Sequence, residues 1–98
     1  MATFITTLKF TEKGIQGIRE SGKRAAAFKA AAKKMGIKVI GNYWTLGYFD
    51  GVMVFEAPDD ETATAAMLQL SGQGYVHTTT GRAFDASEIE KVVTLLGK

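Results

Sequence analysis

The stretch KVIGNYWTLGYFDGVMVFE, residues 38–56, decides the fold that we predict for this chain. Side chains alternate over residues 38–46, and residues 52–56 are rich in β-branched and aromatic types, so both segments are predicted strands. The residues between them include Asp50 and Gly51, a common turn pair. Two strands with a short connection pair as an antiparallel hairpin, which stands in the middle of the predicted order of elements.

One long amphipathic helix is predicted before this hairpin in the sequence, and a second one after it. Residues 23–35 contain six alanines, the best helix formers, and are followed by Gly36 as a left-handed C-cap. The second helix is predicted to start after Asp59, whose carboxylate can cap it, and to end at Gly72 and Gly74. The apolar stripes are Phe28, Ala31, Ala32 and Met35 in the first helix, and Ala63, Ala66, Met67 and Leu70 in the second.

Two further strands complete the sheet. Residues 4–10 place Phe4, Thr6 and Leu8 on one face, while Ile5, Thr7 and Lys9 face the other way. Residues 75–84 form the fourth strand, and Asp85 and Glu88 have capping-box spacing for a short final helix. The order predicts one α+β domain over residues 1–98: a ferredoxin-like βαββαβ two-layer sandwich with a four-stranded antiparallel sheet and helices on one side only.

The composition indicates the size of the domain and the cellular compartment. The 98 residues suffice for one compact domain, 46% of them are hydrophobic, and the net charge is only +2. The absence of cysteine excludes disulfides and thiolate chemistry. Neither a signal-peptide pattern nor an apolar run of about 20 residues is present, so we expect a cytoplasmic protein that does not enter a membrane.

Several motifs resemble the signature of the GYD domain family, in the same order along nearly the whole chain. They are ESGKRA at 20–25, YWTLGYFD at 43–50, EAPDD at 56–60 and TTTGRAF at 78–84. The chain departs from the family pattern at Phe49, where the family has a tyrosine hydroxyl, and at His77, where arginine is common.

The resemblance implies a dimeric α+β barrel, in which two sheets pack face to face across a two-fold axis. The open sheet face is expected to carry Ile5, Trp44 and Leu46, and apolar surface of that kind marks an interface. We therefore expect a homodimer or a higher homo-oligomer.

Polar residues expected on the same open face are the first ligand-binding candidates. They are Lys9, Asn42, Trp44 and Arg82, which could line a small-molecule pocket between subunits, with Lys9 or Arg82 holding an anionic group. The alternative is that these cations pair with Glu56 or face water.

His77 and Asp50 are candidates of a different kind. His77, the only histidine, can act as a general base, although no nucleophile partner is recognisable and a structural or solvated role is the alternative. Asp50 can bind a ligand or cap backbone N–H groups of its turn. Ser21 and Arg24 at the start of a helix suggest a weak anion site. Without a second histidine or a cysteine, we expect no metal and no cofactor.

Nucleic-acid binding is not expected. The first long helix is basic and can attract nucleic acid or an acidic protein, but with a low net charge a solvated face explains it as well. The fold is shared with an RNA recognition module, whose motifs require a cation where Leu46 stands and an aromatic ring where Asp50 stands. The sequence thus favours a homo-oligomeric small-molecule-binding domain, which could be a cofactor-free enzyme, with a structural or regulatory oligomer as the alternative.

Overall fold

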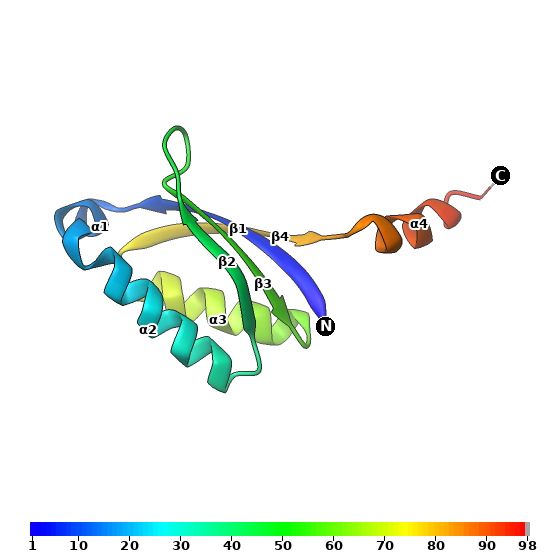
Figure 1. The fold of residues 1–98 in the computed structure, drawn as a ribbon, viewed down its shortest axis with the longest axis horizontal. Coiled ribbons are helices and arrows are strands. Elements are labelled where there is room, and N and C mark those ends of the chain that lie inside the picture. Colours follow the sequence, from blue (N-terminus) through cyan, green and yellow to red (C-terminus); the bar gives the residue numbers. More distant parts are fainter. Residues whose placement is uncertain (98) are drawn as a thin grey trace.

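The computed structural model describes residues 1–97, in which four strands form one antiparallel sheet of order β2-β3-β1-β4. The elements are β1 (Ala2–Phe10), α1 (Glu12–Gln16), the 3₁₀ helix η1 (Ile18–Glu20), α2 (Ser21–Lys34), β2 (Lys38–Trp44), β3 (Gly51–Ala57), α3 (Asp60–Gly72), β4 (Val76–Ala83) and α4 (Ala86–Thr94). Helices α2 and α3 lie on the same side of the sheet, and its other face is bare (Figure 1). The predicted ferredoxin-like α+β fold is confirmed.

The core lies between the sheet and the two long helices. Phe4 of β1 is paired with Phe55 of β3, and their rings stack with centroids 5.3 Å apart. The buried hydrophobic residues are Phe4, Phe28, Ala32, Ile37, Met53, Phe55, Ala57, Ala63, Ala66 and Met67. Both predicted helical stripes therefore contribute to the core. The buried Thr6 hydroxyl shares a hydrogen bond of 2.7 Å with Thr80 Oγ1, which satisfies it.

The helix ends follow the predicted capping chemistry. Asp59 accepts a hydrogen bond of 2.7 Å from the Thr62 N–H at the start of α3. Asp85 and Glu88 form a reciprocal capping box at the start of α4. Gly36, after α2, has a φ of 82°, a conformation that glycine adopts without a Cβ penalty.

An irregularity in β2 reverses the side-chain alternation of that strand. Val39 lies opposite Phe55, but the next paired residue on β2 is Gly41, opposite Val54, so that Ile40 is an extra residue. A one-residue bulge shifts every following side chain to the other face. Asn42 and Trp44 consequently share the face of Met53, towards the helices, and the prediction that they lie on the open face is wrong.

The connection between β2 and β3 is longer than predicted. β2 ends at Trp44 and β3 begins at Gly51, so Leu46 lies in the projecting loop rather than on the sheet (Figure 1). Leu46 is fully exposed there, and its predicted place on the open sheet face is also wrong. The loop is anchored at its base, where the Thr45 N–H donates to the Asp50 carbonyl at 2.9 Å.

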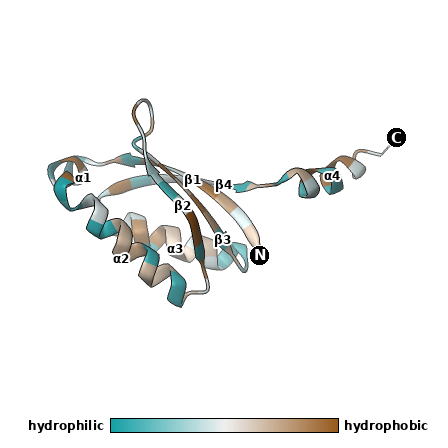
Figure 2. Ribbon diagram, in the orientation of Figure 1, coloured by the Kyte–Doolittle hydropathy of each residue, from teal (hydrophilic) through white to brown (hydrophobic). Residues whose placement is uncertain are grey.

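Helix α4 extends away from the rest of the chain at the end of β4 (Figure 1). It carries apolar residues, as the body of the protein does (Figure 2). Ile89, Val92, Val93, Leu95 and Leu96 are all exposed. Among residues 1–97, no helix combines the length and the apolar character needed to cross a bilayer.

Candidate functional site

The six candidate residues fall into three separate places. Lys9 and His77 are opposite partners on β1 and β4, and both lie on the open face as the alternation of β1 predicts. The Lys9 ammonium lies 4.2 Å from the centroid of the Tyr48 ring, a cation–π contact that joins the projecting loop to the sheet. His77 is exposed, so this pair forms an accessible polar surface rather than a pocket.

Arg82 is on the helix side of β4, because it pairs with Phe4, whose ring is buried in the core. Its placement on the open face is therefore another wrong prediction. The guanidinium donates to the carbonyls of Thr3 at 3.2 Å and Ala83 at 2.6 Å, and it lies 3.7 Å from the Glu88 carboxylate. Glu88, and not Glu56, is thus its acidic partner. These contacts tie the end of the sheet to the start of α4.

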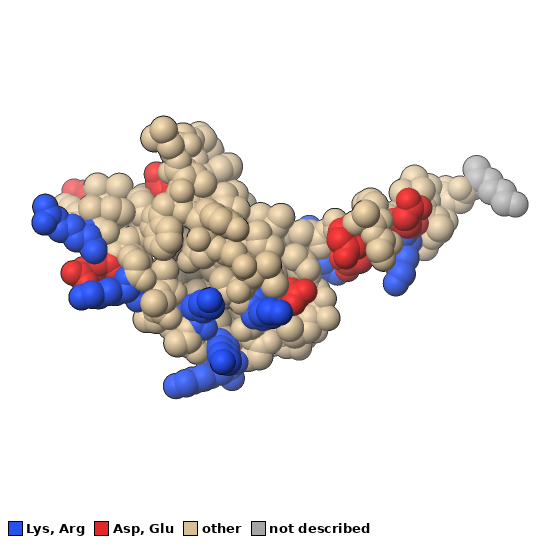
Figure 3. Space-filling model, viewed as in Figure 1, with Lys and Arg blue, Asp and Glu red and all other residues tan. Residues whose placement is uncertain are grey.

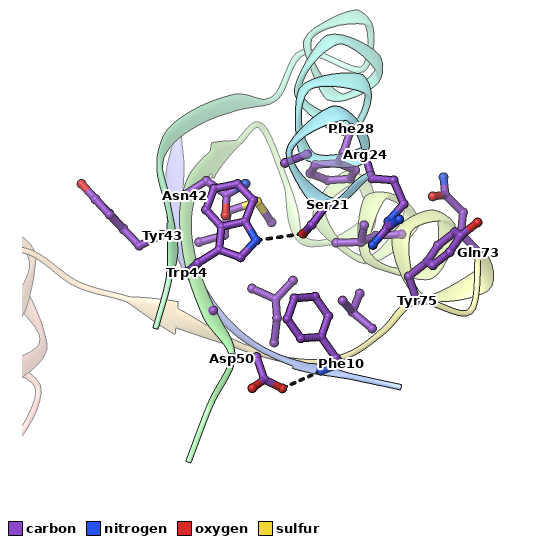
Figure 4. Close-up of a pocket in the computed structure, with 16 residues that line it drawn as sticks. Phe10, Ser21, Arg24, Phe28, Asn42, Tyr43, Trp44, Asp50, Gln73 and Tyr75 are labelled. Atoms are coloured by element: carbon purple, nitrogen blue, oxygen red, sulfur yellow. Dashed lines mark hydrogen bonds between the residues drawn. The ribbon is translucent and has the colours of Figure 1, made fainter. Parts of the chain in front are cut away.

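Asn42, Trp44 and Asp50 come together at a pocket on the helix side of the sheet (Figure 4). The pocket has a volume of about 70 Å³ and lies where α2, the end of β2 and the segment before β4 meet. Such a volume exceeds the requirement of one water molecule, which is about 10–15 Å³ by the same measure. Its apolar walls come from Leu8, Phe10, Phe28, Met53, Leu70 and Val76.

Hydrogen bonds fix two of the polar lining residues. The Trp44 Nε1–H donates to Ser21 Oγ at 2.8 Å, which holds the indole against the start of α2. Asp50 Oδ2 accepts from the Phe10 N–H at 2.8 Å, so the carboxylate joins the hairpin to the end of β1. Asp50 therefore binds a backbone N–H of β1, and not one of its own turn as predicted.

Arg24 and Tyr75 also line the pocket, and little in the sequence indicated their contacts. Arg24 Nη1 donates to the Gly17 carbonyl at 2.9 Å, and its guanidinium lies 4.1 Å from the Tyr75 ring centroid. Nη2 of Arg24 is buried and has no hydrogen-bond partner within residues 1–97. The sequence suggested Arg24 only together with Ser21 at a helix start. Nothing near Tyr75 in the sequence marked it as a lining residue.

The described residues offer little catalytic chemistry. Within residues 1–97, no three histidine, aspartate or glutamate side chains are arranged to hold a metal ion. The pKa of Asp59 is lowered by hydrogen bonds from the side chain and the backbone N–H of Thr62, but this carboxylate caps α3 and does not line the pocket.

The features above define a class of protein: a ferredoxin-like α+β chain with a bare sheet face and a small pocket beneath its first long helix. The sequence profile of the GYD domain matches residues 4–93. The chain therefore belongs to the GYD domain family.

Two relatives come from the bacterium Thermus thermophilus. A protein named glutamine synthetase and cystathionine beta-lyase binding protein is 31% identical over 90 residues, which cover 91% of this chain and 95% of the relative. The crystal structure of a protein from the same organism superposes with a TM-score of 0.55 at 25% identity, covering 88% of this chain and 96% of that one.

Proposed function

We propose that this chain is a self-associating regulatory protein of the cytoplasm that binds metabolic enzymes, rather than a catalyst. The observation that carries the proposal is the amount of apolar surface left bare on the sheet and on α4. The name of the Thermus relative, which describes a protein that binds two enzymes, supports it. Of the two functions that the sequence left open, this is the structural or regulatory one.

The open sheet face is the surface for self-association. Val54 lies at its centre, opposite both Ile5 and Gly41, and Ile5 is 42% exposed although it is a large apolar residue. Side chains of two such faces interdigitate when sheets pack against each other. A C₂ dimer of the α+β barrel type buries both faces at once.

Helix α4 supports the same assembly. A helix of nine residues is marginally stable in water when it has no packing partner. The apolar side chains of α4 are largely exposed in the single chain, and a second copy would cover them. We place α4 against the neighbouring subunit, where it would lengthen the contact between the two sheets.

The outer side of α2 is the surface that we assign to enzyme contact. Lysine side chains gather over this part of the molecule (Figure 3), and Lys29, Lys33 and Lys34 are exposed. This surface is on the far side of the chain from the open sheet face, so it stays free when two sheets pack. Positive charge at a rim speeds association with an acidic partner and makes it salt-dependent.

The test is a titration of the purified chain against glutamine synthetase and cystathionine β-lyase from its own organism, by isothermal calorimetry at two salt concentrations. We expect saturable binding to at least one enzyme, weakened by salt and weakened about tenfold by Lys33→Glu. Lys13→Glu makes the same charge change on α1, outside the surfaces assigned to enzyme contact and to self-association, and serves as the control. Absence of heat and of co-elution with both enzymes would overturn the enzyme-binding proposal.

Small-molecule binding is a second candidate, and the unpartnered Nη2 of Arg24 favours it. The open-face pocket expected from the sequence is replaced by the helix-side pocket, which contains Asn42, Trp44 and Asp50. Lys9, His77 and Arg82 have no part in it. A pocket with mostly apolar walls and a few polar groups has the character of a ligand site.

A further inference from the structure

The helix-side pocket is polarised along its length. Arg24 and Asp50 both line it, and they lie at opposite ends, with Phe10 between them (Figure 4). One end therefore favours an anionic group and the other repels one. The walls between the two ends are apolar, so a ligand would have an apolar body with its charge at a single end.

The cationic end is held ready for an additional acceptor. Two contacts fix the Arg24 guanidinium, the hydrogen bond from Nη1 to the Gly17 carbonyl and the face of the Tyr75 ring. Nη2 remains buried without an acceptor, which is a costly arrangement for a charged donor. Because Nη2 itself is buried, an oxygen in the pocket reaches it only after a turn of the guanidinium, and that bond would remove the cost. A carboxylate forms the stronger, charge-assisted bond.

Ser21, the first residue of α2, adds to the same preference through its hydroxyl. The Ser21 hydroxyl accepts from Trp44 and keeps its own hydrogen for an acceptor.

A hydrogen bond to the backbone holds the carboxylate at the anionic end in position. Asp50 Oδ2 is bound to the Phe10 N–H, so the carboxylate cannot turn away from the hairpin without losing this bond. A second carboxylate placed beside it would be repelled. The charge of Asp50 thus orients a monocarboxylate with its head towards Arg24.

We propose that the helix-side pocket binds a small monocarboxylate with an apolar body, its carboxylate on Arg24 Nη2 and its body against Leu8, Phe10 and Met53. This inference rests on the small-molecule candidate above and names the class of ligand. It makes Arg24 the residue that selects the anion. It does not depend on enzyme binding or on self-association.

The test compares butyrate with 1-butanol, which has the same chain length but no charge. Trp44 is the only tryptophan and lines the pocket, so its fluorescence reports binding, and a proton–nitrogen correlation spectrum locates the affected residues. We expect saturable binding of butyrate and at least about tenfold weaker binding of butanol. We expect about the same loss of butyrate affinity in Arg24→Gln.

Lys33→Gln removes the same charge from the exposed side of α2 and should leave butyrate binding within about twofold. Circular dichroism checks that each variant folds. If Arg24→Gln does not fold, Arg24→Lys, which keeps the charge, takes its place. Equal binding of butanol, or full binding by folded Arg24→Gln, would overturn the carboxylate assignment while leaving an apolar ligand pocket. If neither probe binds, the carboxylate inference and the small-molecule candidate both fail, and the calorimetry with the two enzymes still decides the regulatory proposal.

Discussion

Trp44 and Ser21 join the end of β2 to the start of α2 by a hydrogen bond of 2.8 Å from the indole Nε1–H to the hydroxyl oxygen. The two residues are 23 positions apart, so the bond joins the two ends of the α2–β2 segment. It also holds the indole at the wall of the pocket, so the fluorescence of Trp44 should respond to changes there.

Ser21→Ala should release the indole without changing the fold. A single hydrogen bond contributes about 0.5–1.5 kcal/mol to stability, and this one is partly exposed, so we expect a loss at the lower end of that range. The emission maximum of Trp44 should move to longer wavelength as the ring gains contact with water. Ser71→Ala, a hydroxyl deletion in α3, is the control for emission. An unchanged spectrum would mean that the bond is not populated in solution.

Phe55→Ala should cause the largest loss of stability among single core changes. Phe55 is 1% exposed and stacks on Phe4, and removal of a buried aromatic ring costs about 3–5 kcal/mol. Urea denaturation followed by circular dichroism measures the difference. Tyr48→Ala removes a ring that is 77% exposed and should cost about 0.5 kcal/mol or less. Similar midpoints for the two variants would contradict the assigned core.

Val54→Lys should abolish self-association and preserve the fold. The change places a charge at the centre of the open sheet face, where a second sheet would have to bury it. Light scattering coupled to gel filtration should show the mass of a single chain, with the dissociation constant of the assembly raised about tenfold or more. Leu68→Lys, on the exposed side of α3, should assemble like the unchanged protein. If the protein without any substitution is monomeric at micromolar concentration, the predicted self-association is wrong.

The cap of α3 predicts a defined dependence of stability on pH. Hydrogen bonds from Thr62 hold the pKa of Asp59 below its ordinary value of 3.8. A lowered pKa means that the folded state prefers the charged carboxylate, so this contribution is present above the unfolded pKa and is lost as the pH falls through the folded one. Asp59→Asn still caps the helix but does not titrate. Its melting temperature, measured from about pH 6 down to about pH 2, should fall less steeply than that of the unchanged protein. Parallel curves would count against the cap.

The fold was predictable because each element carries a local signal. Alanine content and the Phe28–Ala32 spacing marked α2, and carboxylates marked the starts of α3 and α4 at Asp59 and Asp85. These signals depend on neighbours in the sequence, so they do not require knowledge of the tertiary structure. The βαββαβ arrangement then followed from the rules of chain connection.

The faces of the sheet were harder to predict. Strict alternation from Val39 puts Trp44 on the open side, and the extra residue Ile40 reverses that result. No sequence signal distinguishes such a bulge from regular alternation in this strand. For Arg82, polarity suggested solvent, although the residue pairs with buried Phe4 near the end of the sheet, where its charged group reaches Glu88.

The pocket could be predicted only in part. Asn42, Trp44 and Asp50 were named as candidates, although Asn42 and Trp44 were expected on the open face and Asp50 in the hairpin turn. Arg24 and Tyr75 meet across about fifty positions of sequence, and only the packing of α2 against the segment before β4 brings them together. Contacts of that range leave no periodic pattern in a single sequence.

The bulge between Val39 and Gly41 also restricts how this protein can misassemble. β2 is an outer strand, and the free N–H and C=O groups of an outer strand can template another strand and, by repetition, a fibril. The extra residue breaks the even spacing of those groups, so an incoming strand would find no continuous row to pair with. The chain can therefore keep its bare sheet face for its proper partner while the border formed by β2 resists endless stacking.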